Sequence, residues 1–170
     1  SFVDEFLLSN HWRIVLTGSR GAGMFNHRDT LHTSSFQAKI RGRKRWHICS
    51  TANDVILEGE AEEGRADLFR PDYTQFPQLK DLDCFADELM PGEVLFYPKN
   101  YWHQTESMDD VSLGFTGTLI DQNNWRDVKQ EFENLCAKDN REDWYQPSDD
   151  LCAVLQSSCF PWWEAAFSFD

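Results

Sequence analysis

The sequence has little positive charge, no long apolar run and no closely paired cysteines. Its 170 residues carry 16 Lys and Arg against 29 Asp and Glu, so the formal net charge is −13. This excess opposes binding to nucleic-acid phosphates and to anionic lipid. No segment approaches the roughly 18 apolar residues of a membrane span, and the first residues do not resemble a secretion signal. We therefore expect no direct nucleic-acid partner and no membrane span.

The cysteines are few and irregularly spaced. They number five and include no C-x-x-C pair, which argues against a zinc ribbon and against a disulfide scaffold. We predict buried free thiols, with a disulfide among Cys136, Cys152 and Cys159 as the alternative. The absence of an Asn-x-Ser/Thr sequon favours an intracellular setting, in the cytoplasm or nucleus. The chain also contains no initiator Met, so we expect it to be cut from a longer protein.

Apolar and aromatic residues are abundant. They make up 41% and 14% of the chain, too much for a disordered segment and enough to fill a β-rich core. The length is that of about one domain. Neither feature predicts an oligomeric state.

Short segments rich in β-branched and aromatic residues, bounded by turn residues, dominate the first 120 residues. Met90-Pro91-Gly92-Glu93 is the clearest turn, because Pro presets φ and Gly supplies φ > 0, and it predicts a hairpin over 84–97. No helices alternate with the strands, so we predict a mostly β fold, a β-sandwich or jelly roll. The predicted strands are 12–17, 34–40, 45–49, 84–89, 93–97 and 111–118.

The pattern changes after Thr118. Apolar residues recur at helical spacing from Trp125 to Leu135, and Ser148 precedes a second apolar set as an N-cap. This part holds 11 acidic and 4 basic residues. We predict a β core over 1–120, with the absence of upstream strands left open, and an acidic helical extension over 121–170 that packs on the core.

Three side chains are candidates for a metal site. His27 and Asp29 are two residues apart, and residues at i and i+2 of an extended strand face the same side. His103 lies near the start of a later strand, and a roll topology can return that strand to the first. Two histidines and one carboxylate leave three positions open on an octahedral ion, as in non-haem Fe(II) oxygenases. We expect His32 to lie beside this set or on the surface, and His47 to be an ordinary sheet residue.

These residues fall within a longer pattern. His27-Arg-Asp29 is followed by Gly42-Arg-Lys44-Arg-Trp46, by P-G-E-V-L-F-Y-P over 91–98, and by Trp102-His103. Over residues 12–118 the order and spacing resemble the JmjC-domain 2-oxoglutarate oxygenases of the cupin superfamily, and most of all the JmjC lysyl-hydroxylase type.

The resemblance implies a double-stranded β-helix that holds Fe(II) through His27, Asp29 and His103. It implies that Lys44 pairs with the distal carboxylate of 2-oxoglutarate, and that Gln37 and Thr116 make further polar contacts to it. A buried ammonium needs an anionic partner, which agrees with this role for Lys44. Without the resemblance, an exposed member of the basic run Arg41, Arg43, Lys44 and Arg45 is the favoured interpretation of Lys44.

Two positions depart from the family pattern. Relatives often carry Thr or Ser three residues before the first iron histidine, and here that residue is Met24, whose side chain donates no hydrogen bond. The tyrosine that relatives supply from an upstream strand is not found. We expect Trp102, Phe36, Trp46 and Phe115 to form apolar walls of the pocket or ordinary core.

The resemblance implies a dioxygenase that converts 2-oxoglutarate and O2 to succinate and CO2 while it hydroxylates a protein or peptide side chain. Demethylation is the less favoured variant, because aromatic cages and reader modules are not evident. The alternative from another class is a catalytically inactive cupin-like module that binds metal and a protein partner. A third possibility is a cupin enzyme that uses another divalent metal and no 2-oxoglutarate. The match at Lys44 argues against it, because such an enzyme has no distal carboxylate to bind.

Overall fold

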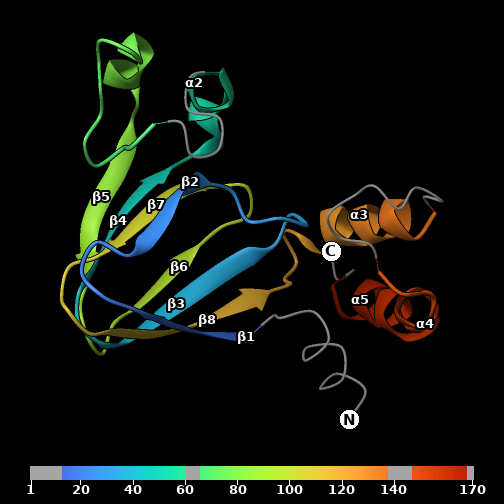
Figure 1. Cartoon of the computed structure of the whole chain (residues 1–170). Helices are drawn as coiled ribbons and strands as arrows, with labels where there is room; N and C mark the ends of the chain where they lie inside the picture. The colour runs from blue at the N-terminus through green and yellow to red at the C-terminus, as the bar shows by residue number, and fades with distance from the viewer. Residues whose placement is uncertain (1–12, 60–65, 138–146, 168–170) are drawn as a thin grey trace.

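Two antiparallel sheets form the body of the protein. The computed structural model describes residues 13–59, 66–137 and 147–167. One sheet has the strand order β1-β8-β3-β6 and the other β2-β7-β4-β5, and the two lie face to face (Figure 1). The predicted mostly β jelly roll with a helical C-terminal part is confirmed. The strands are β1 (Arg13–Gly18), β2 (Gly23–His27), β3 (Ser34–Arg41), β4 (Lys44–Cys49), β5 (Cys84–Leu89), β6 (Val94–Tyr97), β7 (Trp102–Ser107) and β8 (Ser112–Leu119).

Strand β3 shows how the sequence sets the two faces of a sheet. Ser35, Gln37 and Lys39 are buried, whereas Phe36 and Ala38 between them are only partly buried. Side chains alternate across a strand, so the polar set points between the sheets and the apolar set points outward. The interior of the roll is therefore unusually polar, and this prepares it for a ligand rather than for a dry core.

The structure contains two strands that the sequence pattern did not predict. Strand β2 follows a glycine-rich turn and holds Asn26 and His27, and β7 is rich in polar residues. Neither shows the apolar alternation that identifies a strand by itself. Both pair within the same sheet, and they supply two of the predicted metal ligands.

The predicted hairpin over 84–97 is wrong. Strand β5 pairs with β4 in one sheet, whereas β6 pairs with β3 in the other. The turn itself forms, since the Glu93 amide donates to the Met90 carbonyl at 3.0 Å and Gly92 has φ 92°. The turn chemistry was thus correct, but the chain crosses from one sheet to the other at this point.

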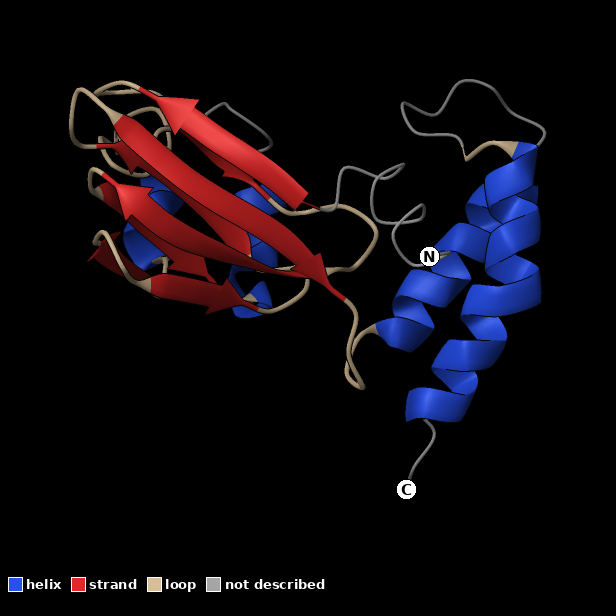
Figure 2. Ribbon diagram, turned by 90° about the horizontal axis from the view of Figure 1, so that it is seen from below, coloured by secondary structure: helices blue, strands red, loops and turns tan. Residues whose placement is uncertain are grey.

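The C-terminal helices gather beside the roll rather than over a sheet (Figure 2). They are α3 (Trp125–Ala137), α4 (Asp149–Val154) and α5 (Phe160–Phe167), with a π-helical turn at Leu155–Cys159 between the last two. Ser148 caps α4 by accepting a hydrogen bond from the Leu151 amide at 3.2 Å. Their apolar faces form one cluster, which includes the fully buried Phe132 and Leu155. Among the helices that the structure describes, none is long and apolar enough to cross a membrane.

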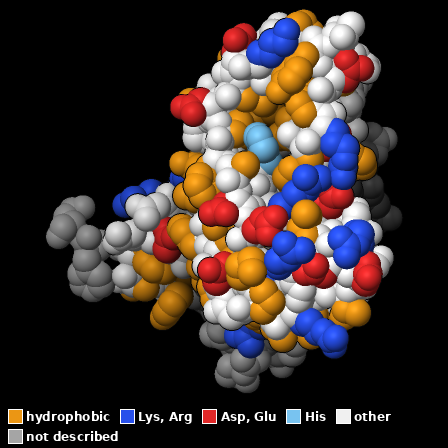
Figure 3. All heavy atoms as spheres, turned by 90° about the vertical axis from the view of Figure 1, so that its left-hand side faces the viewer, with side chains coloured by type: hydrophobic (Ala, Val, Ile, Leu, Met, Phe, Trp, Pro, Cys, Tyr) orange, Lys and Arg blue, Asp and Glu red, His pale blue; other side chains and the backbone are white. Residues whose placement is uncertain are grey.

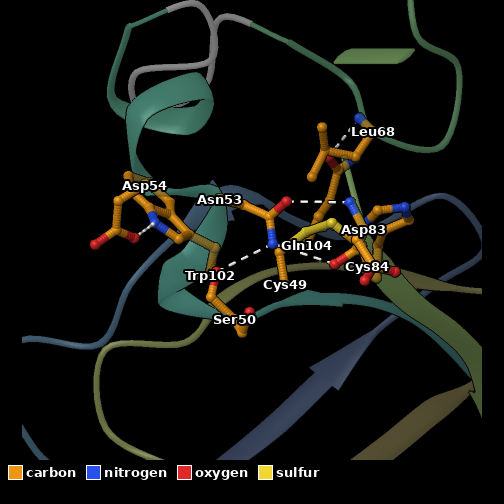
Figure 4. Close-up of a disulfide and its surroundings, with 10 residues drawn as sticks. Cys49, Ser50, Asn53, Asp54, Leu68, Asp83, Cys84, Trp102 and Gln104 are labelled. Atoms are coloured by element: carbon orange, nitrogen blue, oxygen red, sulfur yellow. Dashed lines mark hydrogen bonds between the residues drawn. A yellow bond between two sulfur atoms is a disulfide. The ribbon is translucent and has the colours of Figure 1, made fainter. Parts of the chain in front are cut away.

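A second apolar cluster covers the outer face of the β2-β7-β4-β5 sheet. Helix α2 (Asp54–Gly59) and the segment after residue 66 pack there against Cys49 and Trp102. Asn53 links Ser50 and Asp83 by hydrogen bonds of 3.1 to 3.2 Å (Figure 4). The cluster braces the strands that carry the candidate site from behind.

The prediction of free thiols is wrong for four of the five cysteines. Cys49 on β4 and Cys84 on β5 lie opposite each other in register and form a disulfide, as do Cys136 and Cys152. Only Cys159 is free and buried. The alternative, a disulfide among Cys136, Cys152 and Cys159, is confirmed by the Cys136–Cys152 bond. The Cys49–Cys84 bond was not predicted, because it depends on the pairing of β4 with β5. Disulfides persist mainly in oxidising compartments, so the cysteines do not support an intracellular setting.

Candidate active site

The three predicted ligands converge at one end of the roll. The Nε2 atoms of His27 and His103 lie 3.9 Å and 3.6 Å from Asp29 Oδ1, and one ligand atom from each residue lies within 4.8 Å of the other two. The histidine rings are 4.2 Å apart between centroids. This spacing suits three ligands around a single ion.

Backbone carbonyls orient both imidazoles. His27 Nδ1 lies 2.7 Å from the Phe25 carbonyl, and His103 Nδ1 lies 3.1 Å from the Tyr101 carbonyl. A carbonyl only accepts, so each Nδ1 carries the proton and each Nε2 is free to coordinate. Burial lowers the pKa of His103, with the His27 charge as a second cause. His103 is therefore neutral at pH 7, the form that binds a metal.

The strands supply these residues through an irregular pairing. Strands β2 and β7 pair with a register shift between Met24 and His27, which brings His27 directly opposite His103. A bulge of this kind re-aims a side chain and is common next to active sites. Asp29 follows just after the end of β2, so no regular strand geometry holds its carboxylate.

Neighbouring hydroxyls position Asp29 instead. Ser35 donates to Asp29 Oδ2 at 2.6 Å, and the Tyr97 hydroxyl lies beside Asp29, Ser35 and Thr116. Burial, followed by the Asp29 charge, raises the pKa of Tyr97 well above its ordinary value, so it stays a neutral phenol. Asp29 Oδ1 is left to face the two histidines.

A cavity of about 360 Å³ extends from the three ligands into the roll. Its size is in the usual range for a small-molecule site. The structure brings all the predicted site residues to its wall, namely His27, Asp29, His103, Lys44, Gln37 and Thr116. Thr116 already donates to the Phe36 carbonyl at 2.7 Å, so its hydroxyl offers a ligand only an acceptor.

Lys44 enters the cavity without an anionic partner. It is 9% exposed, and in the described part of the chain its ammonium contacts no carboxylate and lies 5.6 Å from the centroid of the Trp46 ring. Burial, with repulsion from Lys39, lowers the pKa of Lys44 to about 8. A buried ammonium in this state favours an incoming carboxylate.

Two buried polar atoms on the cavity wall also lack partners. Within the described residues, Gln37 Oε1 and Trp46 Nε1 have no hydrogen bond, and both residues line the cavity. Such atoms are expensive to leave unpaired. The Trp46 N–H is a donor and fits a carboxylate or oxo oxygen beside Lys44, whereas the Gln37 oxygen only accepts, so Gln37 would have to turn its amide N–H to such a ligand. The two histidines with Asp29 fit Fe(II), and Lys44 with the Trp46 donor fits 2-oxoglutarate.

Of the four aromatic residues expected at the pocket, only Trp46 lines it, 5.7 Å from the His103 ring. Phe36 and Phe115 contact each other on the outer face of their sheet, with ring centroids 6.1 Å apart. Trp102 points away into the cluster under α2 and donates to Asp54 at 2.8 Å. Side chains alternate between the two faces of a strand. Trp102 is next to the inward-facing His103, and Phe36 is next to the inward-facing Gln37, so both aromatic side chains point outward.

The other histidines lie elsewhere. His32 Nδ1 is 3.0 Å from Asn100 Oδ1 near the mouth of the roll. His47 lies 3.6 Å from the Cys49 sulfur, and because Cys49 and Cys84 are bonded to each other, these three residues do not form a metal site. His11 lies outside the described residues.

Sequence reasoning missed Ser35, Tyr97 and Thr105, which all line the cavity. Ser35 lies two residues from Gln37 on β3, and Thr105 lies two residues from His103 on β7. Residues two apart on a strand face the same side, so this spacing could have identified both as inward-facing. No predicted site residue lies on the strand of Tyr97, and that strand was assigned to a hairpin, so the sequence did not indicate which way Tyr97 faces. Met24 also lines the cavity and, as expected, offers only an apolar side chain there.

Several known proteins resemble this chain in sequence. The cupin-like domain family matches residues 9–117. The human HSPB1-associated protein 1 is 29% identical over 121 residues, which cover 67% of this chain and 23% of that protein. The arginine-specific demethylase JMJ20 of Arabidopsis thaliana is 25% identical over 169 residues (90% of this chain, 34% of that protein). The mouse 2-oxoglutarate and iron-dependent oxygenase JMJD4 is 23% identical over 173 residues (93% and 40%).

The chain spans between about a quarter and two fifths of the length of these relatives. The family match covers more than half of the chain and includes His27, Asp29, Lys44 and His103. The jelly roll, the three converging ligands and the relatives with JmjC domains agree with one another. The chain therefore belongs to the cupin-like domain family and is a JmjC-type member of the cupin superfamily.

Proposed function

We propose that this protein is an Fe(II)- and 2-oxoglutarate-dependent dioxygenase that hydroxylates a protein side chain. The observation that carries the proposal is the cavity itself, which has two histidines and a carboxylate at one end and the unpaired ammonium of Lys44 at the other. The overall conversion is 2-oxoglutarate, O2 and a C–H group to succinate, CO2 and a C–OH group.

Each part of the cavity has a role in this reaction. His27, Asp29 and His103 would hold the iron and leave adjacent positions open, and the bound iron supplies the activation of O2. Lys44 would pair with the distal carboxylate of 2-oxoglutarate, while Gln37 and Trp46 orient the molecule by hydrogen bonds. Ser35 and Tyr97 keep Asp29 aimed at the metal.

The substrate we propose is a polypeptide segment that contains Lys or Arg. The net charge of −13 favours encounter with basic partners. On the face shown in Figure 3 the acidic and basic side chains are interspersed, so specificity must depend on local contacts. Hydroxylation is preferred to demethylation on the resemblance to lysyl hydroxylases, although one relative is named as an arginine demethylase, and both reactions begin with hydroxylation of a C–H bond.

The alternative is a catalytically inactive metal-binding module that acts as a protein-interaction domain. Two observations favour it. Several relatives are named for association with HSPB1, and Met24 stands where many oxygenases supply a hydroxyl. In this case the metal would stabilise the roll, and no succinate would form.

An anaerobic titration with Fe(II) and then 2-oxoglutarate separates the two. We expect the visible metal-to-ligand charge-transfer band of the chelate, saturating at about one equivalent. Asp29→Ala should abolish Fe(II) binding and the band, whereas Lys44→Met should bind Fe(II) normally but need about 10- to 150-fold more 2-oxoglutarate, the loss of one charge-assisted hydrogen bond.

Exposed residues provide matched controls. Asp81→Ala and Lys80→Met change the same residue types on the surface and should leave both titrations unchanged. If Fe(II) binds but no band forms, the inactive module is the better description. If Asp29→Ala and Lys44→Met lose metal affinity equally, the separate roles assigned to them are wrong.

A further inference from the structure

A second cavity lies behind Lys44, away from the metal ligands. It has a volume of about 180 Å³ and shares Leu16, Met24, Gln37 and Lys44 with the first cavity. None of the metal ligands lines it. Lys44 therefore stands between two chambers. The remaining wall of this rear cavity is mainly polar or small and consists of Thr17, Gly18, Ala22, Gly23, Lys39, Ser107, Ser112 and Gly114.

The rear cavity contains a second buried lysine, to which the proposed reaction assigns no role. Lys39 is 3% exposed, lies on the inward face of β3, and donates from Nζ to the Ser112 hydroxyl. Burial lowers the pKa of Lys39, and the Asp109 charge opposes this shift. Asp109 itself is held by Arg43, through both the guanidinium at 3.0 Å and the backbone amide at 2.8 Å. Among the residues that the structure describes, Lys39 thus has a hydroxyl but no carboxylate as its direct partner.

The charges in this cavity are unbalanced. Two lysines line it and no Asp or Glu does, and Lys39 repels the charge on Lys44. The distal carboxylate of one 2-oxoglutarate would neutralise only one of two ammonium groups. Buried charges are stable when paired, so the arrangement calls for a second anion next to Lys39, where hydroxyls of Ser107 and Ser112 are available as donors.

We propose that the rear cavity is a second anion site, in which Lys39, Lys44 and Ser112 bind a small oxyanion such as inorganic phosphate or a carboxylate. The site is separate from the metal-facing cavity, and it does not require iron. The anion offsets the repulsion between the two lysines and leaves Lys44 charged for a ligand on its other side. Both cavities can then be filled at once.

Calorimetric titration of the metal-free protein with inorganic phosphate at constant ionic strength, and with acetate in a parallel arm, tests the site. We expect one equivalent to bind, with the arm of higher affinity identifying the oxyanion. Lys39→Met should weaken binding at least tenfold, Ser112→Ala severalfold, and Lys80→Met, an exposed control, not at all. If neither anion binds, or if Lys39→Met binds as tightly as the unchanged protein, the proposal is wrong.

Two further measurements keep the outcome clear. Lys39→Arg preserves the charge and should keep the phosphate affinity within about threefold. It replaces Lys39→Met if circular dichroism shows that Lys39→Met is unfolded. A tenfold loss of affinity in a folded Lys39→Arg counts against the site.

In the Fe(II) titration, saturating phosphate should leave the 2-oxoglutarate band at full amplitude, with the 2-oxoglutarate affinity within about threefold. Simple competition would place phosphate in the front cavity and overturn the proposal. Failure of the band with intact phosphate binding would instead count against the proposed function alone.

Discussion

Lys44 is the residue through which pH should control co-substrate binding. Burial lowers its pKa to about 8, and only the ammonium form pairs with a carboxylate. Bound 2-oxoglutarate raises that pKa, so affinity is full below pH 8 and falls as the pH rises above it, by at most about tenfold per unit. Anaerobic charge-transfer titrations from pH 7 to 9 measure this trend.

An arginine at the same position supplies the control for the pH effect. Lys44→Arg keeps its charge throughout this range, so its affinity, whatever its value at pH 7, should not change up to pH 9. A decline of the same size in Lys44→Arg and in the unchanged protein would assign the pH dependence to another group.

Tyr97 should act on the metal through Asp29. Its hydroxyl lies beside Asp29 and Ser35, and loss of such an outer contact typically weakens metal binding by about 10- to 100-fold. We expect Tyr97→Phe to bind Fe(II) more weakly by a factor in this range in an anaerobic metal titration. Tyr73→Phe, on the surface, should bind as before. Unchanged affinity in a folded Tyr97→Phe would show that Ser35 alone positions the carboxylate.

At the scale of elements, the turns that connect strands differ in how well they tolerate the replacement of glycine by alanine. Gly42 has φ 70°, and a Cβ there would lie 2.2 Å from the Val111 carbonyl oxygen; Gly92 has φ 92° but open space around it. A left-handed conformation costs a non-glycine residue about 1–2 kcal/mol. Gly92→Ala should therefore lower the free energy of unfolding by about that amount.

Gly42→Ala carries the same conformational cost plus a backbone clash. We expect it to lower the free energy of unfolding clearly more than Gly92→Ala does, because the β3–β4 turn must move away from Val111. Urea denaturation of the two variants side by side measures the difference. Equal losses would mean that the β3–β4 turn adjusts without strain.

At the scale of the whole molecule, the helical cluster and the metal site are built from different parts of the chain. Phe132 is fully buried among α3, α4 and α5, whereas the metal ligands lie on β2 and β7 or, for Asp29, just after β2. Phe132→Ala should cost about 3–5 kcal/mol and loosen the helices while leaving Fe(II) affinity unchanged. Hydrogen exchange and metal titration report the two effects separately.

The exposed position Gln130 on the same helix provides the comparison. Gln130→Ala should alter neither hydrogen exchange in the helices nor metal binding, because the side chain is exposed and donates to Asn134 of the same helix at 3.2 Å. Loss of metal binding in Phe132→Ala would show that the helices and the roll fold as one cooperative unit, contrary to this expectation.

Local chemistry in the sequence determined much of this protein. Short segments rich in β-branched and aromatic residues, bounded by turn residues, predicted most strands. Helical spacing from Trp125 to Leu135 predicted α3, and the Ser148 cap predicted the start of α4. The spacing of His27, Asp29, Lys44 and His103, together with the family resemblance, was enough to name the residues that the structure gathers around one cavity. These signals are readable because they depend on periods and spacings within a short stretch of chain.

Only the tertiary structure decided the features that depend on which strands lie next to each other. The Met90–Glu93 turn joins two sheets rather than one hairpin, the Cys49–Cys84 bond needs β4 beside β5, and Tyr97 reaches Asp29 only because β6 lies in the opposite sheet. Lys39 on β3 and Lys44 on β4 likewise line one cavity only because their two strands face each other across the interior. Strand pairing is a long-range choice set by the burial of whole faces, so no local pattern in the sequence specifies it.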